Sequence, residues 1–92
     1  MLITRTIDQS ICVNHQLTLT VQELTDERVM LFVENAVDGT EELVVLELHQ
    51  EYQISEYGTR LWPDLIDVLG VTFTIQHDPQ VIVHRAESGE MN

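Results

Sequence analysis

Two stretches far apart in the chain alternate apolar and polar residues with a period of two. Leu17-Thr18-Leu19-Thr20-Val21-Gln22 lies near the start and Val71-Thr72-Phe73-Thr74-Ile75 near the end. Successive side chains of a β-strand point to opposite faces, so this period is typical of a strand with one buried face. Both stretches are therefore predicted to be strands, and Leu17, Leu19 and Val21 are predicted to face the core.

Shorter runs of apolar, often β-branched residues predict further strands around these two. They are Met1 to Ile7, Ile11 to Val13, Val29 to Val33, Leu43 to Leu48 and Val81 to Arg85. The first two runs and 17–22 are expected to form a meander of three antiparallel strands. Residues 29–48 are expected to form an acidic hairpin, with Glu51 to Ile54 as a candidate extension of its second strand. The expected fold class is therefore mostly β.

One segment has the pattern of a helix instead. Between Trp62 and Leu69, apolar residues recur at positions i, i+3, i+4 and i+7, which line one face of an α-helix. Pro63 suits the first helical position, and Gly70 suits the C-terminal cap. A single short helix is therefore predicted over Trp62 to Leu69.

The charge of the chain is strongly unbalanced. Its 92 residues, enough for one domain, carry 16 acidic residues against four arginines and no lysine, a net charge of −12. The segment from Glu23 to Glu56 holds most of the acid and only Arg28 to oppose it, whereas Met1 to Gln22 holds one acid and one base. A negative field of this kind repels nucleic acid and membrane surfaces and favours basic partners.

No residue pattern indicates an enzyme, a cofactor site or a metal site. The four histidines, His15, His49, His77 and His84, lack the spacing of metal ligands, and no glycine-rich phosphate loop is present. The single cysteine cannot form an internal disulfide, so a reduced, cytoplasmic protein is predicted. No apolar run approaches the length of a membrane span.

Two of the expected strands compete for one place in the fold. Val29 to Val33 and Val71 to Ile75 could each follow the opening meander. We interpret them as alternatives for one strand rather than as an internal repeat. With Val71 to Ile75 in that place, residues of about 26–70 form an insertion, whereas with Val29 to Val33 the insertion shifts to about 34–80.

Two blocks at the chain ends resemble one known family. Met1-Leu2-Ile3-Thr4-Arg5, Ser10-Ile11 with Val13, and Leu17 to Val21 resemble the opening of the carbon storage regulator (CsrA/RsmA) family of RNA-binding proteins. Val71 to Glu87, which ends in Val83-His84-Arg85, resembles the family's closing pair of strands. Together the blocks cover about 40 of the 92 residues on a gapless comparison.

This resemblance implies a five-stranded antiparallel sheet in an intertwined homodimer, in which the first strand of one subunit lies beside the last strand of the other. The core strands would be residues 1–24 and 71–86, with the acidic hairpin and the helix forming an insertion over 26–70. It also implies translational regulation by binding GGA-containing hairpin loops of mRNA leaders or small RNAs. The RNA-binding residues carried over are Ile3, Thr4, Arg5, Val83, His84 and Arg85.

The chain departs from the family pattern at several positions. Thr6 replaces a second basic residue, Thr25-Asp26-Glu27 makes the loop after the third strand acidic, and a short acidic tail, Ala86 to Asn92, stands where the family has a helix. These departures keep a second hypothesis open. The chain would then be an acidic protein-binding module or nucleic-acid mimic, such as a phage-type inhibitor, acting on a basic nucleic-acid-binding partner. Its candidate binding face consists of Glu41, Glu42, Glu47 and Glu51.

Overall fold

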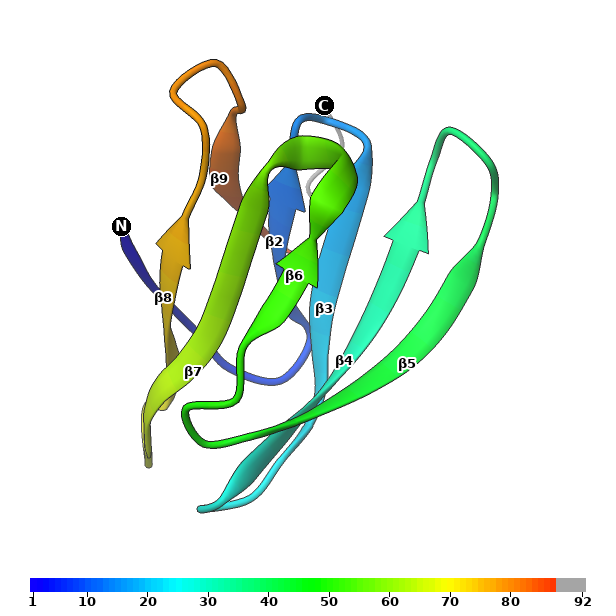
Figure 1. Cartoon of the computed structure of the whole chain (residues 1–92). Helices are drawn as coiled ribbons and strands as arrows, with labels where there is room; N and C mark the ends of the chain where they lie inside the picture. The colour runs from blue at the N-terminus through cyan, green and yellow to red at the C-terminus, as the bar shows by residue number, and fades with distance from the viewer. Residues whose placement is uncertain (88–92) are drawn as a thin grey trace.

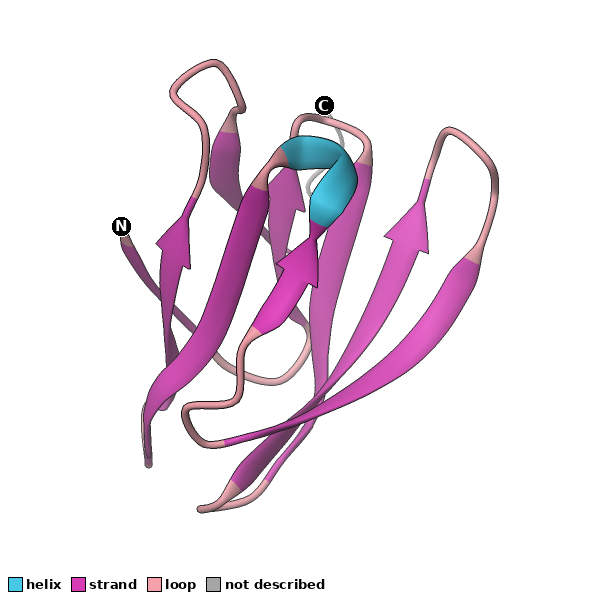
Figure 2. Ribbon diagram, viewed as in Figure 1, coloured by secondary structure: helices cyan, strands magenta, loops and turns pink. Residues whose placement is uncertain are grey.

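Nine strands and one short 3₁₀ helix make up residues 1–87, the part of the chain that the computed structural model describes (Figures 1 and 2). In chain order they are β1 (Leu2–Arg5), β2 (Gln9–Val13), β3 (Leu17–Leu24), β4 (Arg28–Asn35), β5 (Glu41–Glu47), β6 (Tyr52–Ile54), η1 (Ser55–Tyr57), β7 (Thr59–Asp67), β8 (Gly70–Gln76) and β9 (Val83–Glu87). The prediction of a mostly β fold is confirmed. Of the predicted tail, residues 86 and 87 belong to β9, and the rest lies outside the described residues.

The strands form two antiparallel sheets that pack face to face (Figure 1). The four-stranded sheet has the order β1-β8-β7-β6, and the five-stranded sheet has the order β5-β4-β3-β2-β9. Alternate residues of both sheets point into one shared core, and Leu17, Leu19 and Val21 are buried there as predicted. Phe73 is the largest of the fully buried side chains.

The predicted helix over Trp62 to Leu69 is wrong, because this segment is most of β7 and its turn into β8. Leu61 and Pro63 are buried while Trp62 between them is half-buried, which is the alternation of a strand. A β-bulge after Pro63 then shifts the phase of the alternation. Pro63 lies beyond the end of the β6–β7 ladder, so its missing N–H leaves no gap there.

The opening meander is also partly wrong. β2 and β3 pair as expected, but β1 belongs to the other sheet, where it pairs with β8. Similarly, β6 does not extend β5, because the chain crosses to the other sheet between Glu47 and Tyr52. Residues 26–70, expected as an insertion, contain β4 to β7 and contribute to both sheets and to the core.

The second half of the chain repeats the fold of the first. The sheet order β5-β4-β3-β2 matches β1-β8-β7-β6 strand for strand when β1 to β4 are equated with β5 to β8. Val21 pairs with Leu31 just before a bulge in β3, and Pro63 pairs with Phe73 just before a bulge in β7. Each residue of the second pair lies 42 positions after its counterpart. A shared register with a bulge at the same place identifies the two hairpins as structural repeats.

The corners between the two sheets repeat as well. Asp8, between β1 and β2, has a φ of 73°, and His49, between β5 and β6, has a φ of 71°. The Asp8 N–H donates to the Val21 carbonyl oxygen at 2.8 Å, and the His49 N–H donates to the Pro63 carbonyl oxygen at 2.7 Å. The same corner therefore connects the two sheets in each half.

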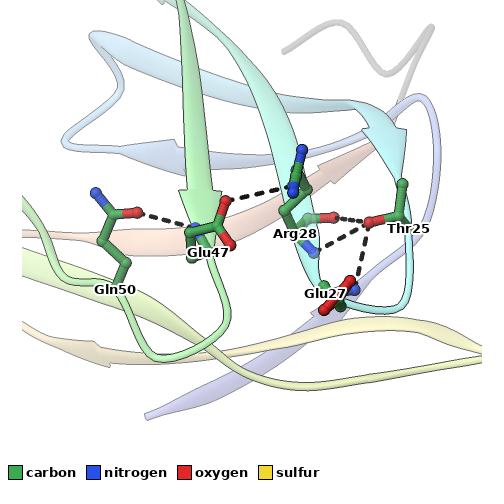
Figure 3. Close-up of polar contacts among 5 residues, drawn as sticks. All are labelled: Thr25, Glu27, Arg28, Glu47 and Gln50. Carbon is green, nitrogen blue, oxygen red and sulfur yellow. Dashed lines mark hydrogen bonds and ion pairs between the residues drawn. The ribbon is translucent and has the colours of Figure 1, made fainter.

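The side chain that closes each corner is a glutamine in both halves. The Gln9 Oε1 atom accepts a hydrogen bond from the Thr6 N–H at 3.0 Å, and the Gln50 Oε1 atom accepts one from the Glu47 N–H at 2.9 Å (Figure 3). These residues are offset by 41 positions instead of 42, because the β6–β7 connection is one residue longer than the β2–β3 connection. The interpretation of 29–33 and 71–75 as alternatives for one strand is therefore wrong, since they are β4 and β8, equivalent strands of two halves.

Candidate functional site

The two terminal strands lie at neighbouring edges of the two sheets. β1 is an edge strand of the four-stranded sheet, and β9 is an edge strand of the five-stranded sheet. β9 pairs with β2, which follows directly after β1 in the chain, so both edges lie on the same side of the molecule. The six residues expected to bind RNA lie on these two strands or directly at their ends. We call this pair of strands the β1/β9 edge.

Arg5 connects the strands of this edge from the inside. Only 5% of its surface is exposed, and its Nη1 atom donates to the Ala86 carbonyl oxygen of β9 at 3.2 Å and to the Ser10 carbonyl oxygen of β2 at 3.5 Å. Its Nε atom donates to the Thr4 carbonyl oxygen at 2.8 Å. A buried guanidinium is tolerated where backbone oxygens accept hydrogen bonds from its N–H groups. Arg5 therefore has a structural role at the centre of the edge.

The other predicted RNA-binding residues divide between core and surface. Ile3 and Val83 are buried, while Thr4 and Arg85 are exposed and His84 is half-buried. The His84 Nδ1 atom lies 2.8 Å from the Arg85 carbonyl oxygen, and the imidazole rings of His84 and His15 lie 5.4 Å apart. Thr4 thus faces outward from the four-stranded sheet and His84 from the five-stranded sheet, with His15 beside His84 in the β2–β3 turn, and Arg85 is the exposed arginine of the edge.

The four acidic residues of the alternative site do not form one cluster. Glu41 and Glu42 begin β5, Glu47 ends it, and Glu51 lies in the crossing to β6. Glu47 forms an ion pair of 3.3 Å with Arg28 (Figure 3), and Glu51 forms one of 3.2 Å with Arg60. All four side chains belong to exposed residues. Glu41 and Glu42 remain as a pair at one end of β5, next to β6.

Tyr52 connects β6 to this pair and was missed by sequence reasoning. Its hydroxyl group donates to Glu42 Oε1 at 3.1 Å. Partial burial, this hydrogen bond and the negative charges of Glu42 and Glu56 raise the pKa of Tyr52 to about 12. The raised pKa stabilises the fold fully below the ordinary tyrosine value of about 10, and this contribution is lost as the pH rises toward 12. A lone tyrosine between polar residues gives no sign of such a contact in the sequence.

Replacing Glu42 by Gln is expected to lower the pKa of Tyr52 part of the way toward 10, because the charge is removed while burial remains. The ¹³Cζ chemical shifts of both tyrosines, followed by NMR across an alkaline titration, measure this change. Tyr57 is the internal control, since its hydroxyl group donates to Gln16 Oε1 at 2.6 Å and not to Glu42. An unchanged Tyr52 midpoint in the variant would show that the Glu42 contact is absent in solution.

A groove opens beside β6, between the edges of the two sheets. It has a volume of about 180 Å³, and the apolar side chains of Leu17, Val33 and Ile54 lie along it together with Asp38, Glu42 and Glu56. Leu17 and Val33 belong to the core, so the groove reaches toward the space between the sheets. Sequence reasoning assigned Leu17 to the core and gave no indication of the groove, which arises only because the fold places β6 opposite the start of β5.

Within residues 1–87, no group of His, Cys, Asp and Glu side chains is arranged to hold a metal ion. The same residues contain no helix that is long and apolar enough to cross a membrane. Comparisons of the chain with family models, with curated proteins and with solved structures find no match.

Proposed function

We propose that this chain is a post-transcriptional regulator that binds hairpin loops of RNA at the β1/β9 edge. The observation that carries the proposal is the hydrogen bond from Arg5 Nη1 to the Ala86 carbonyl oxygen, which ties the two terminal strands together. These strands hold the six residues that the resemblance to the CsrA/RsmA family assigns to RNA binding. In that family, the first strand of one subunit and the last strand of the other form the RNA-binding edge.

In this proposal a single chain takes the place of the intertwined homodimer that the resemblance implies. The repeat of β1 to β4 by β5 to β8 supports it, because two similar halves of one chain enclose a common core. β1 of the first half pairs with β8 of the second half, and β5 of the second half pairs with β4 of the first half. The two halves thus exchange a strand, as the subunits of an intertwined dimer do.

The exposed groups of the edge fit the loops of RNA hairpins. Arg85 can bond a phosphate group or the O6 and N7 atoms of guanine, and Thr4 can donate or accept a hydrogen bond. Unstacked bases can lie against the imidazole rings of His15 and His84. With one exposed guanidinium at the β1/β9 edge and a net charge of −12 for the chain, binding is expected to be weak and to fall as salt is added.

Replacing Arg85 by Ala is expected to reduce RNA affinity about 5- to 150-fold, because one base or phosphate contact of Arg contributes about 1–3 kcal/mol. The measurement is a gel-shift titration of a GGA-loop RNA hairpin over a series of salt concentrations. The slope of log affinity against log salt is expected to become shallower by about one unit if Arg85 binds phosphate.

The matched control replaces Arg60 by Ala. Arg60 is an exposed arginine of β7 that forms an ion pair with Glu51. The Glu41→Gln/Glu42→Gln variant controls for charge at the far edge of the five-stranded sheet. Both are expected to keep the arginine-dependent binding of the native chain. Binding that Arg60→Ala and Arg85→Ala reduce equally would locate the RNA elsewhere, and no binding at low salt would exclude the RNA function.

A second candidate function is the binding of a basic protein by the acidic side of the molecule. The observation that favours it is the position of Glu41 and Glu42, which are exposed on β5, an edge strand of the five-stranded sheet. Glu47 at the end of β5 and Glu51 after it already form ion pairs with arginines of the chain. Either function is proposed for a cytoplasmic protein.

A further inference from the structure

The two halves of the fold differ in one respect that leaves a strand position open. β9 lies beside β2, at the edge of the five-stranded sheet. The equivalent of β2 in the second half is β6, which is itself the edge strand of the four-stranded sheet. β6 has β7 on one side and no strand on the other among residues 1–87. The repeat therefore defines where one further strand would pair.

β9 shows what such a strand contributes. Val83 pairs with Val13 of β2, and both side chains are buried. Val81, just before β9, is buried as well. Ile54 of β6 is the counterpart of Val13, 41 positions later, so a strand added to β6 would bring an aliphatic side chain opposite Ile54.

The groove beside β6 lies over residues of the core. Leu17, Val33 and Ile54 line this groove of about 180 Å³, and each keeps only 4–5% of its surface exposed. Asp38, Glu42 and Glu56 lie along the same groove and are exposed to solvent. An occupant with cationic side chains next to its aliphatic ones would therefore meet opposite charges, whereas an acidic occupant would be repelled.

We propose that the open edge of β6 binds an extended, basic segment of a partner protein, which adds a fifth strand to the four-stranded sheet. The backbone of the segment would form a ladder with β6, and its alternate aliphatic side chains would enter the groove. A second copy of this chain fits less well, because its β9 is already paired with its own β2. The inference goes beyond RNA binding at the β1/β9 edge and does not depend on it.

The probe for the experiment is a capped peptide with the sequence of residues 80–86, Gln-Val-Ile-Val-His-Arg-Ala, which pairs with β2 within the chain and contains one arginine. It is titrated into the ¹⁵N-labelled full chain and followed by NMR. Saturable shifts of the amide signals of Tyr52, Gln53 and Ile54 are expected, with a Kd on the order of 100 μM. A peptide with alternate backbone amides N-methylated is expected to bind at least tenfold more weakly, because it cannot complete the ladder.

Charge is tested with two matched double variants. Glu42→Gln/Glu56→Gln is expected to weaken peptide binding about three- to tenfold, because two negative charges that attract the arginine of the peptide are removed. Glu23→Gln/Glu27→Gln, which removes the same charge from the β3–β4 hairpin, is expected to change it less than twofold. Shifts confined to β2 and β9 would mean that the peptide exchanges with the native strand and would overturn the proposal. So would equal binding of the N-methylated peptide, or shifts of the β6 signals with protein concentration alone, which would identify a second copy as the occupant.

Discussion

Gly70→Ala is expected to lower the free energy of unfolding by about 3 kcal/mol or more. Gly70 begins β8 with a φ of +131°, a conformation that residues with a Cβ atom rarely adopt. A Cβ atom at this position would also overlap the carbonyl group of Arg5, at the end of β1. Both are rigid backbone, so β1 must move away from β8 to accommodate the methyl group. Chemical denaturation with a fluorescence or circular dichroism readout measures the change.

Gly39→Ala is the matched control for this substitution. Gly39 also has a positive φ, +74°, but nothing lies within 4 Å of the position that its Cβ would occupy. Its replacement is expected to cost about 1 kcal/mol, the price of the backbone conformation alone. Equal losses in the two variants would show that β1 does not lie against Gly70 in solution.

Arg5→Ala is expected to lower the free energy of unfolding by about 2–4 kcal/mol. The substitution removes a buried aliphatic stem and leaves the Ala86 carbonyl oxygen without the guanidinium donor. Amide hydrogen exchange should accelerate more in β9 than in β5, because β9 accepts a hydrogen bond from Arg5 and β5 lies at the opposite edge of the same sheet. The RNA affinity is expected to fall together with the order of β9, since Arg85 lies on that strand.

Arg5→Leu separates packing from hydrogen bonding at this site. The counterpart of Arg5 in the second half is Leu46, which is 2% exposed, so a leucine is compatible with this position of the fold. The Leu variant is expected to recover much of the stability lost by Arg5→Ala but not the protection of β9. If β9 is equally protected in the native chain and in both variants, Arg5 does not hold this strand in place.

The strands with uninterrupted alternation could be predicted from sequence, and the bulged strand could not. In β3 the buried positions 17, 19 and 21 all precede the bulge, so the alternation of buried and exposed residues is uninterrupted over these positions. In β7 the bulge follows Pro63 directly, and the apolar residues after it fall by chance at helical spacing. An extra residue in a strand changes the phase of the pattern, and only pairing with β8 reveals it.

The repeat and the orientation of Arg5 escaped sequence reasoning for different reasons. Equivalent positions keep their burial but not their residue type, as Val21 and Pro63 show, so the two halves share little sequence. For Arg5 the signal was present, because a period of two places it on the same face as the buried Ile3. The family resemblance assigned Arg5 to an RNA-binding surface instead, and the Ala86 carbonyl group that it contacts belongs to a strand at the other end of the chain.

The repeat within one chain also changes what a single substitution can do. In a symmetric homodimer every substitution occurs twice, so the two ends of the assembly must remain alike. Here position 5 is arginine while its counterpart is leucine, and among residues 1–87 a strand closes the edge at β2 while none closes the edge at β6. Joining the halves in one polypeptide thus frees each edge to acquire its own ligand, and it makes assembly independent of protein concentration.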